Sequence, residues 1–403
     1  MFALIISLII PFLIWGPFVP DLIVSLSSLV FLIYVFKDKL FFYFTKKPLI
    51  AFFIFCIYCI LISIFIAEDT LLSFESSLFY FRIGVFSCLI WYLLEQDKKI
   101  LNYVYYALVI SFSALIVDGY IQFFTGTNII GLPKVGDRIS SFFGDELIIG
   151  SYISRLFPLL FALFVVRMKK KLELYFMILF FLLLSGLILI SGERAAFFFY
   201  VLSFVFIIIF MTGYAKLRII LSAGSVIVII IITSSFDQLK KRMLSDPINT
   251  IAKSIFTPQH DSLIRTAFNM FLDKPIFGHG SKMFRVICND EKYAVGITPC
   301  MTHPHNFYVQ LLAETGITGF SFLFSAFAYV LYCAYRQFKS IVLGQKRYLT
   351  DYQVCLLAGI LITVWPLTTN GNFFHNWLMI VYSLPVGFYL HSIYGKNRKN
   401  ISF

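Results

Sequence analysis

Two histidines, an asparagine and a proline lie together in the run Thr302-His303-Pro304-His305-Asn306, where a long polar stretch meets an apolar one. A neutral imidazole can accept a proton from a hydroxyl group, so His303 and His305 are candidates for acid–base chemistry. Proline favours the first turn of a helix, which predicts that a helix begins at Pro304 and holds His305 in that turn. The helix dipole there would keep His305 neutral near pH 7. The alternative is a pair of interfacial histidines at a helix start.

A polar stripe follows the histidines at four-residue spacing, formed by Asn306, Gln310 and Glu314. Residues at this spacing share one face of a helix. Asn306 and Glu314 are therefore expected to orient groups near His305. Glu314 is the rival base, although its depth in an apolar stretch favours a structural role. Two glycines a little further on, Gly316 and Gly319, are expected to let another helix approach closely.

Four arginines lie away from the basic connections of the chain. Arg82 and Arg155 fall inside apolar stretches, Arg138 lies in a loop, and Arg194 lies at a turn. A charge within a membrane span costs about 2.5–3.5 kcal/mol, so it usually faces a partner or a cavity. Guanidinium groups bind phosphate through paired hydrogen bonds. A cluster of them would suit the diphosphate of a polyprenyl-linked substrate.

Local ion pairing is the alternative explanation for these arginines. Glu193 directly precedes Arg194, and Glu75 lies seven residues before Arg82. A histidine pair spaced His-x-His without a third nearby ligand gives little support for a metal site, and no metal site is predicted.

The composition is that of a membrane protein with several spans. The chain has 403 residues, of which 60% are hydrophobic and 13% charged, and its mean hydropathy is +0.87. The net charge is +12, but the basic residues lie in short connections between apolar runs, which excludes a nucleic-acid-binding surface. We expect one membrane domain over residues 1–403.

About twelve apolar stretches are long enough to be transmembrane helices, which predicts an all-α polytopic fold. They cover 2–16, 20–36, 48–66, 77–94, 101–124, 147–166, 174–190, 195–211, 219–233, 304–334, 352–369 and 373–392. The first two are short and could form one kinked span.

Lysine and arginine gather in alternate connections between these spans. The basic connections are 37–47, 95–100, 167–173, 212–218, 335–351 and the C-terminal tail with Lys396, Arg398 and Lys399. The intervening turns are acidic or uncharged, as at 67–76 and Asn370-Gly371-Asn372. By the positive-inside rule the basic connections are cytoplasmic, which puts the histidines and the four arginines on the outer side.

The outer side carries two long loops, 125–146 and 234–303. In the second, residues 261–271 alternate as an amphipathic helix, capped by Asp261 or Ser262 and ended by Lys274-Pro275. Arg265 lies on this helix. If it has no functional role, we expect it to face solvent or the headgroups of membrane lipids.

The same loop carries Cys288 and Cys300. In an oxidising compartment the two cysteines would form a disulfide that closes a short loop. Two free thiols are the alternative.

The sequence resembles the O-antigen ligase and O-antigen polymerase family. The resemblance is carried by the run His303–Gly319 (HPHNFYVQLLAETGITG), by Arg265 followed by Lys274–Gly280 (KPIFGHG), and by Ser191–Ala196 (SGERAA). The order of these segments, an arginine turn, a long outer loop and a histidine helix, is also that of the family.

This resemblance implies a membrane-embedded glycosyltransferase with a C-type fold in the bacterial inner (cytoplasmic) membrane, with its active site on the periplasmic side. Such enzymes take a glycan from undecaprenyl diphosphate without a cofactor. Ligases join it to the lipid A core, and polymerases join it to another lipid-linked repeat; the sequence does not choose between them. The resemblance also implies inversion without a metal ion, because arginines stabilise the leaving diphosphate.

Site residues follow from the resemblance position by position. His305 matches the motif histidine that assists the acceptor hydroxyl, Arg194 matches the turn arginine, and Arg265 matches the loop arginine. No short motif fixes Arg82, Arg138 and Arg155, which together with His303, Asn306 and Glu314 are expected to bind substrate. Glu193 departs from the small polar residue of many relatives and would partly neutralise Arg194.

A flippase or another polysaccharide transporter is the alternative function. Transporters use charges along a path through the membrane and often contain internal repeats. Here the unusual charges gather on the outer side, which favours chemistry at that surface.

Overall fold

The computed structural model describes residues 2–168, 171–246, 248 and 256–396. Over these residues the protein is all-α, and extended pairing is limited to isolated bridges in the 125–146 loop. In this described part of the chain, nine helices are long and apolar enough to cross a membrane, and three shorter apolar helices accompany them. Together they coincide with the twelve predicted spans and confirm a polytopic all-α protein.

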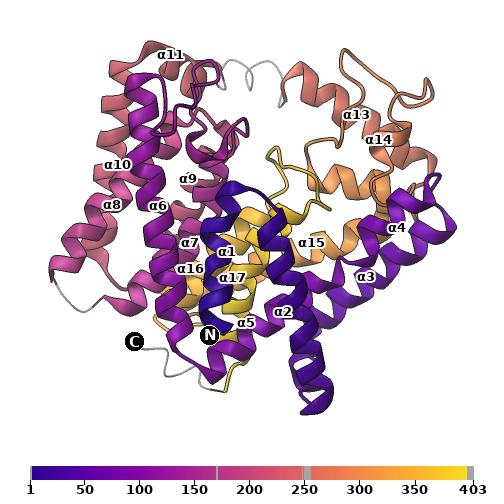
Figure 1. The fold of residues 1–403 in the computed structure, drawn as a ribbon, viewed down its shortest axis with the longest axis horizontal. Helices are drawn as coiled ribbons and strands as arrows, with labels where there is room; N and C mark the ends of the chain where they lie inside the picture. Colours follow the sequence, from indigo (N-terminus) through magenta and orange to yellow (C-terminus); the bar gives the residue numbers. More distant parts are fainter. Residues whose placement is uncertain (1, 169–170, 247, 249–255, 397–403) are drawn as a thin grey trace.

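The first half of the chain forms six of these spans, the fourth of which is broken in two. The helices are α1 (Phe2–Trp15), α2 (Phe18–Lys37), α3 (Lys47–Phe65), α4 (Thr70–Leu78) with α5 (Phe81–Gln96), α6 (Lys99–Thr125) and α7 (Ile149–Arg167). α1 and α2 are two helices packed side by side, not one kinked span (Figure 1).

The second half adds the other spans and the large loop. The helices are α8 (Lys171–Ile190), α9 (Arg194–Phe210), α10 (Ala215–Ser235), α11 (Asp237–Lys240), α13 (Pro258–Asp273), α14 (Phe284–Ile287), α15 (Phe307–Val342), α16 (Asp351–Thr363) and α17 (Asn376–Tyr394). A short π-helix, Lys241–Ser245, follows α11.

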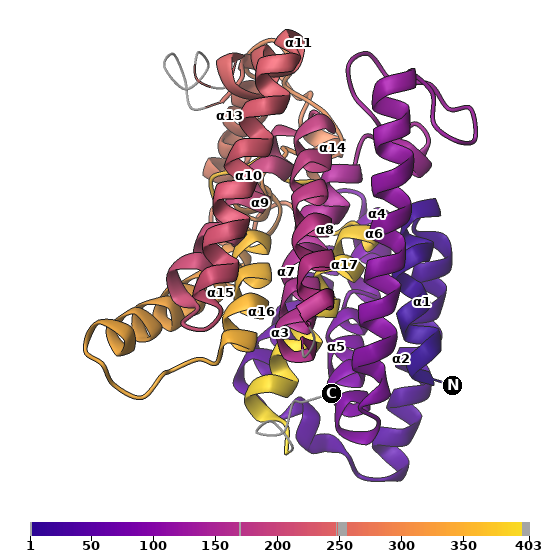
Figure 2. The same cartoon turned by 90° about the vertical axis from the view of Figure 1, so that its left-hand side faces the viewer.

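Two helices form the centre of the bundle. α7 packs against α6, α8, α9 and α16, and α17 packs against α2, α5, α7 and α16 (Figure 2). Most residues of both helices are buried, because their sequences are apolar on every face and therefore suit a position surrounded by other helices. Arg155 is the buried charged residue of α7 and must find polar partners inside the bundle.

The connections of the bundle separate into two ends. The end of α2, the turn between α5 and α6, and the end of α17 lie at the bottom of Figure 1, while α11, α13, α14 and the 125–146 loop lie at the top. This separation is the arrangement expected from the charge pattern, and the orientation in the membrane stays a prediction. Among the predicted cytoplasmic charges, Lys169, Lys170, Arg398 and Lys399 lie outside the described residues.

The helix after the histidines begins later than predicted. α15 starts at Phe307, because the side-chain oxygen of Asn306 accepts hydrogen bonds from the backbone N–H groups of Tyr308 (3.0 Å) and Val309 (3.1 Å) and caps the helix. His305 precedes the helix with φ +56°. The prediction that Pro304 starts the helix and that His305 lies in its first turn is therefore wrong.

α15 is interrupted at Gly316, where φ is +63° and ψ is −170°. The sequence suggested that another helix would approach here. The backbone that approaches this break belongs instead to the loop 274–280. Ile317 N–H donates to the carbonyl of Pro275 at 2.9 Å. An added Cβ at Gly316 would collide with the carbonyl of Ile276, so only glycine permits this contact.

The connection between α16 and α17 is longer than predicted. α16 ends at Thr363, six residues before the expected boundary, and α17 begins at Asn376. We call residues 364–375 the α16–α17 segment. Its Asn370 and Asn372 side chains are buried. Non-helical backbone beside membrane helices is tolerated where it is covered by protein or lines a cavity, so this segment is a candidate part of a site.

The large loop contains the amphipathic helix expected from the sequence, with a different start. α13 begins at Pro258 after Thr257, whose backbone is extended, so the proposed caps Asp261 and Ser262 both lie inside the helix. The predicted end is confirmed, with Lys274 as the C-cap. The predicted disulfide is also present, joining Cys288 and Cys300 with a Cα–Cα distance of 5.0 Å.

Candidate active site

Three histidine rings meet at the end of the bundle that carries α13 and α14. The ring centroid of His305 lies 4.1 Å from that of His303 and 5.4 Å from that of His260. His260 comes from α13, so the large loop folds back over the histidine run. The sequence analysis missed His260 because it lies 45 residues earlier than His305, outside any local motif.

The environment of these rings keeps them neutral. Burial lowers the pKa of His305, and so does the nearby His260. Burial, together with the proximity of His305, lowers the pKa of His303 to about 3. Neutral His305 at pH 7 is thus supported, but the physical cause is desolvation and a neighbouring imidazole, not the helix dipole.

Asn370 of the α16–α17 segment joins His305 to an arginine. Its backbone N–H donates to the carbonyl of His305 at 2.8 Å, and its side-chain oxygen accepts from Nη2 of Arg155 at 3.2 Å. Arg155 is 6% exposed and also donates from Nε to the Tyr382 hydroxyl at 3.0 Å. Its guanidinium lies 4.9 Å from the Phe199 ring centroid.

Arg155 makes no ion pair with any carboxylate of the described residues. A buried guanidinium held by neutral groups keeps its positive charge available to an anionic ligand. We expected Arg155 to face a partner or a cavity, and its partners in the structure are uncharged groups.

Arg194 begins α9 and is paired, but not with Glu193. Its Nη2 lies 3.0 Å from a carboxylate oxygen of Asp246, and its Nε donates to the carbonyl of Arg242 at 2.8 Å. The Glu193 carboxylate instead accepts from Gly150 N–H at 2.6 Å and from the Ser151 hydroxyl at 2.7 Å. Glu193 therefore caps the positive end of α7, and the expectation that it neutralises Arg194 is wrong.

Arg138 and Arg242 meet at Gly192, beside Arg194. Arg242 Nε donates to the carbonyl of Gly192 at 2.9 Å, and Arg138 Nη2 donates to the carbonyl of Leu147 at 2.8 Å. Arg138 Nε is buried and has no hydrogen-bond partner within the described part of the chain. Burial and the charge of Arg242 lower the pKa of Arg138, while Glu193 raises it. These like charges in one place favour an anionic ligand.

The arginines and the histidines are connected through the first turn of α7. Arg155 Nη1 donates to the carbonyl of Ser151 at 3.5 Å, and the Ser151 hydroxyl binds Glu193. Burial raises the pKa of Glu193, and the charges of Arg138 and Arg155 act in the opposite direction. Arg138, Arg155, Arg194 and Arg242, which we call the arginine cluster, are thus linked through Glu193 and the neighbouring Gly192.

The polar stripe of α15 is present and holds loops in place. Gln310 Nε2 donates to Glu314 at 3.0 Å and to Asn372 at 3.0 Å. Glu314 is fully buried and accepts from Phe284 N–H at 3.2 Å. Asn306 also donates to the carbonyl of Pro366 at 2.7 Å. These contacts bind the α16–α17 segment and α14 to α15, which favours a structural role for Glu314.

Two of the expected site arginines lie apart from the histidines. Arg82 pairs with Asp21 at 2.6 Å rather than with Glu75, and it donates to the Ser25 hydroxyl at 3.0 Å. Arg265 is 63% exposed on α13 and lies 3.9 Å from Asp261, one turn away. No contact of either residue with His305 is present among the described residues.

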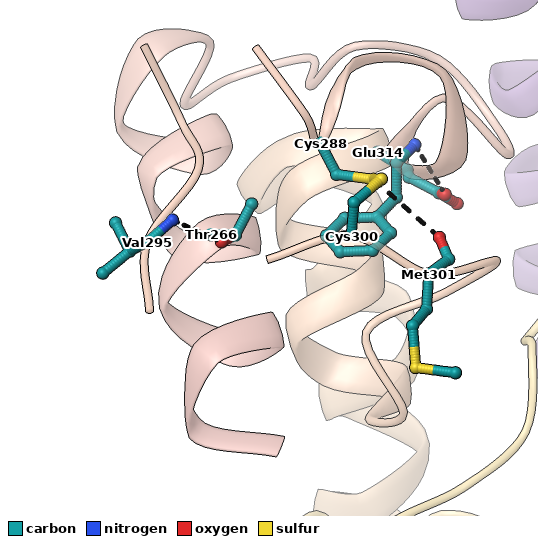
Figure 3. The surroundings of a disulfide bond; sticks show 7 residues. Thr266, Cys288, Val295, Cys300, Met301 and Glu314 are labelled. Carbon is teal, nitrogen blue, oxygen red and sulfur yellow. Dashed lines mark hydrogen bonds between the residues drawn. A yellow bond between two sulfur atoms is a disulfide. The ribbon is translucent and has the colours of Figure 1, made fainter. Parts of the chain in front are cut away.

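The disulfide lies directly before the histidine run. Cys288 follows α14, and its sulfur also lies 3.8 Å from the carbonyl oxygen of Met301, two residues before His303 (Figure 3). On the other side, Glu314 binds the start of α14 through Phe284. The bridge therefore ties the histidine run to α14 and, through it, to α15.

Sequence reasoning also missed Arg242, Arg285, Asn370 and His375. Arg285 lies on α14, and its buried Nε has no hydrogen-bond partner in the described ranges. Its charge, like that of His375, contributes to lowering the pKa of His303. The one available signal was their placement in outer connections, and that signal does not distinguish them from other loop residues. The described residues hold no group of three or more His, Cys, Asp or Glu side chains suited to a metal ion.

Comparison with known proteins matches part of this site, the part that holds Arg194, Arg242 and the three histidines. The sequence model of the family described as O-antigen ligase matches residues 178–324, which run from α8 to the first turns of α15 beyond Gly316. The chain is also similar to the teichuronic acid biosynthesis protein TuaE of Bacillus subtilis (strain 168), with 25% identity over 119 residues. That alignment covers 30% of this chain and 24% of the relative, so the chain spans about a quarter of the relative's length. Residues 178–324 are therefore similar to the O-antigen ligase family.

Proposed function

We propose that the protein is a glycosyltransferase of surface-polysaccharide biosynthesis. It would move a glycan from undecaprenyl diphosphate to a hydroxyl group of an acceptor glycan at the periplasmic face of the inner membrane. The observation that carries the proposal is the link from His305 through Asn370 to Arg155, which joins a neutral base to a buried cation that has no ion-pair partner among the described residues.

The arginine cluster is suited to the donor diphosphate. Arg138 and Arg155 are positively charged and are held by neutral groups. Arg194, at the start of α9, and Arg242, on the π-helix, lie beside them. Preorganised cations of this kind stabilise the negative charge that develops on a leaving group. Arg265 is exposed on α13, the helix that also carries His260, and we propose that it contacts the same diphosphate.

The chemical step then needs one base. His305 accepts the proton of the acceptor hydroxyl while the hydroxyl oxygen forms a bond to the anomeric carbon of the donor sugar. The bond from that carbon to the diphosphate oxygen breaks, and the diphosphate leaves with the electron pair. Attack from the face opposite the leaving group inverts the anomeric centre. These residues would supply the reaction without a metal ion.

The acceptor is either the lipid A core, as in a ligase, or another lipid-linked repeat, as in a polymerase. The name of the matching relative assigns that protein to teichuronic acid biosynthesis. A surface polysaccharide other than O-antigen is therefore the second candidate product.

The test compares polysaccharide profiles of a deletion strain carrying the wild-type gene, His305→Gln or His391→Gln. His391 lies near the other end of α17 and serves as the matched control. We expect His305→Gln to abolish transfer at normal protein level with donor binding retained, and His391→Gln to resemble the wild type.

The pattern of loss identifies the reaction. Loss of long chains with one repeat still attached indicates a polymerase, and loss of every attached repeat with accumulation of lipid-linked polymer indicates a ligase. An unchanged profile for His305→Gln would remove this residue from the mechanism. Lipid-linked repeats that remain on the cytoplasmic face would indicate a transporter instead.

A further inference from the structure

A polar cavity of about 230 Å³ lies between α4, α5 and the start of α17, and one residue of the large loop also lines it. Residues from all four parts line it: Glu75, Ser76, Tyr80, Arg82, Lys282 and Asn376. The cavity is smaller than the roughly 300–1,000 Å³ of sites for drug-sized ligands, so it suits a small polar group such as a single sugar ring.

The charges around this cavity are balanced, unlike those of the arginine cluster. Arg82 is paired with Asp21 at 2.6 Å, and Asn376 Nδ2 donates to the same carboxylate at 3.4 Å. Glu75 and Lys282 remain as one negative and one positive group. A diphosphate would find no excess positive charge here. Hydroxyl groups of a sugar would find a carboxylate acceptor, an ammonium donor and an amide that does both.

Lys282 is held in place at the wall of the cavity. Its backbone φ is +61°, a conformation that residues other than glycine seldom adopt. Its neighbour Ser281 is fully buried. Burial and the charge of Arg285 lower the pKa of Lys282, while Glu314 and Glu75 raise it. Strained residues persist where the surrounding structure fixes them, often at ligand sites.

The α16–α17 segment runs from the histidines to the cavity. Phe374 of this segment lines the cavity, and Asn370, four residues earlier, binds His305 and Arg155. Desolvation and the charge of Lys282 lower the pKa of His375, and His375 in turn contributes to lowering that of His303. In Figure 1 the segment lies between α9, which begins at the arginine cluster, and α4, which borders the cavity.

We propose that this cavity is the acceptor subsite and holds a sugar residue of the acceptor glycan. The inference rests on the proposed function. The donor diphosphate binds on the α7–α9 side of the α16–α17 segment, and the acceptor sugar binds on the α4–α5 side. His305 is bound by Asn370 of this segment, and it accepts the proton of a hydroxyl group presented from the cavity while the arginines hold the donor.

The first test separates acceptor binding from catalysis. Full-length protein in lipid nanodiscs is assayed with an undecaprenyl-diphosphate-linked glycan and with the acceptor fraction of a strain that lacks the gene. Glu75→Gln and the cavity-filling Ser76→Trp are compared with Glu68→Gln, which removes an exposed carboxylate just before α4. Loss of a hydrogen bond to a charged group corresponds to an increase of about tenfold or more in KM for the acceptor.

We expect this increase for Glu75→Gln and Ser76→Trp, with donor KM unchanged and with kcat at saturating acceptor retained in Glu75→Gln. Glu68→Gln should resemble the wild type. Unchanged acceptor KM in both cavity variants, with an active wild type, overturns the acceptor subsite and leaves the proposed function standing. An inactive wild type overturns the proposed function.

A second test does not depend on activity. The thiol introduced by Ser76→Cys is labelled with a maleimide in the presence of glucose, galactose or N-acetylglucosamine, and the thiol introduced by Glu68→Cys is the control. Slower labelling at position 76 alone supports a sugar site. Equal labelling rates at position 76 with every sugar and without sugar overturn it.

Discussion

At the scale of single residues, His305 is fixed by its neighbours rather than by a helix. Its φ of +56° is uncommon outside glycine, and the N–H of Asn370 holds its carbonyl. The rings of His303 and His260 both lie against its own ring. A strained residue that several elements over-determine is characteristic of a functional position.

The first prediction concerns the pH dependence of transfer. His305 acts when neutral, and its pKa lies below the ordinary value of 6.5 because of burial and His260. Activity should therefore persist as the pH falls to 6.5 and decline only in more acidic buffer, when His305 becomes protonated. The measurement is kcat against pH for the reconstituted protein.

Removing His260 should move this acidic limb. In His260→Asn the neighbour that lowers the pKa of His305 is gone, so the limb should shift to higher pH, toward 6.5. His391→Asn is the control and should leave the profile in place. A limb that stays fixed in His260→Asn would show that another group limits the rate.

The sequence predicted some of this residue geometry and not the rest. The spacing of Asn306, Gln310 and Glu314 predicted a shared helix face, and all three side chains bind elements packed there. The partner of Arg82, by contrast, is Asp21 on another helix. Periodicity reports which residues share a face, but it does not report which distant element covers that face.

At the scale of elements, the break in α15 and the loop 274–280 depend on each other. Gly316 leaves room for the carbonyl of Ile276, and an added Cβ at Gly278 would collide with the carbonyl of Glu314. The N–H of Gly280 donates to that same carbonyl at 2.8 Å. The glycines thus let two backbones meet directly beside the polar stripe.

The second prediction is that Gly316→Ala destabilises the protein more than a glycine replacement at an open turn. The backbone conformation at Gly316 costs a non-glycine residue about 1–3 kcal/mol, and the collision with Ile276 adds to this. Gly131→Ala is the control, because φ is +90° there but no atom lies within 4 Å of the added Cβ. Thermal unfolding in detergent compares them, and equal melting temperatures would contradict the prediction.

The third prediction concerns the disulfide that ties down the histidine run. Cys300→Ser, or reduction of the wild type, should lower kcat because the segment from Cys288 to His303 loses its cross-link. The bridge closes a loop of about a dozen residues, for which about 3 kcal/mol of stabilisation is typical. Cys333→Ser, a buried thiol in α15, is the control. Full activity of the reduced wild type would mean that the loop is fixed without the bridge.

At the scale of the whole molecule, hydropathy predicted the spans well because each one must present about 20 apolar residues to lipid. Hydropathy predicted the wrong helix end where buried polar side chains bind other helices. The expected span 352–369 ends at Thr363, because the buried Asn370 and Asn372 of the following segment bind partners on α7 and α15 instead. Long-range hydrogen bonds of this kind leave no periodic signal in the sequence.

The fourth prediction tests the orientation of the bundle. A thiol introduced by Glu68→Cys, near α4, should react with a membrane-impermeant maleimide in intact spheroplasts. A thiol introduced by Lys346→Cys, in the basic connection between α15 and α16, should react only after the membrane is opened. Both positions are exposed, and the native cysteines are buried or bridged. The reverse labelling pattern would put the histidines in the cytoplasm.

The Cys288–Cys300 bridge also has a consequence for biogenesis. Thiols are oxidised outside the cytoplasm and kept reduced within it. In a newly inserted chain, the histidine run would therefore be fixed in place only after this loop has been exported and its two cysteines have been oxidised. A molecule inserted upside down would lack the cross-link, so maturation of the enzyme would depend on its correct insertion into the membrane.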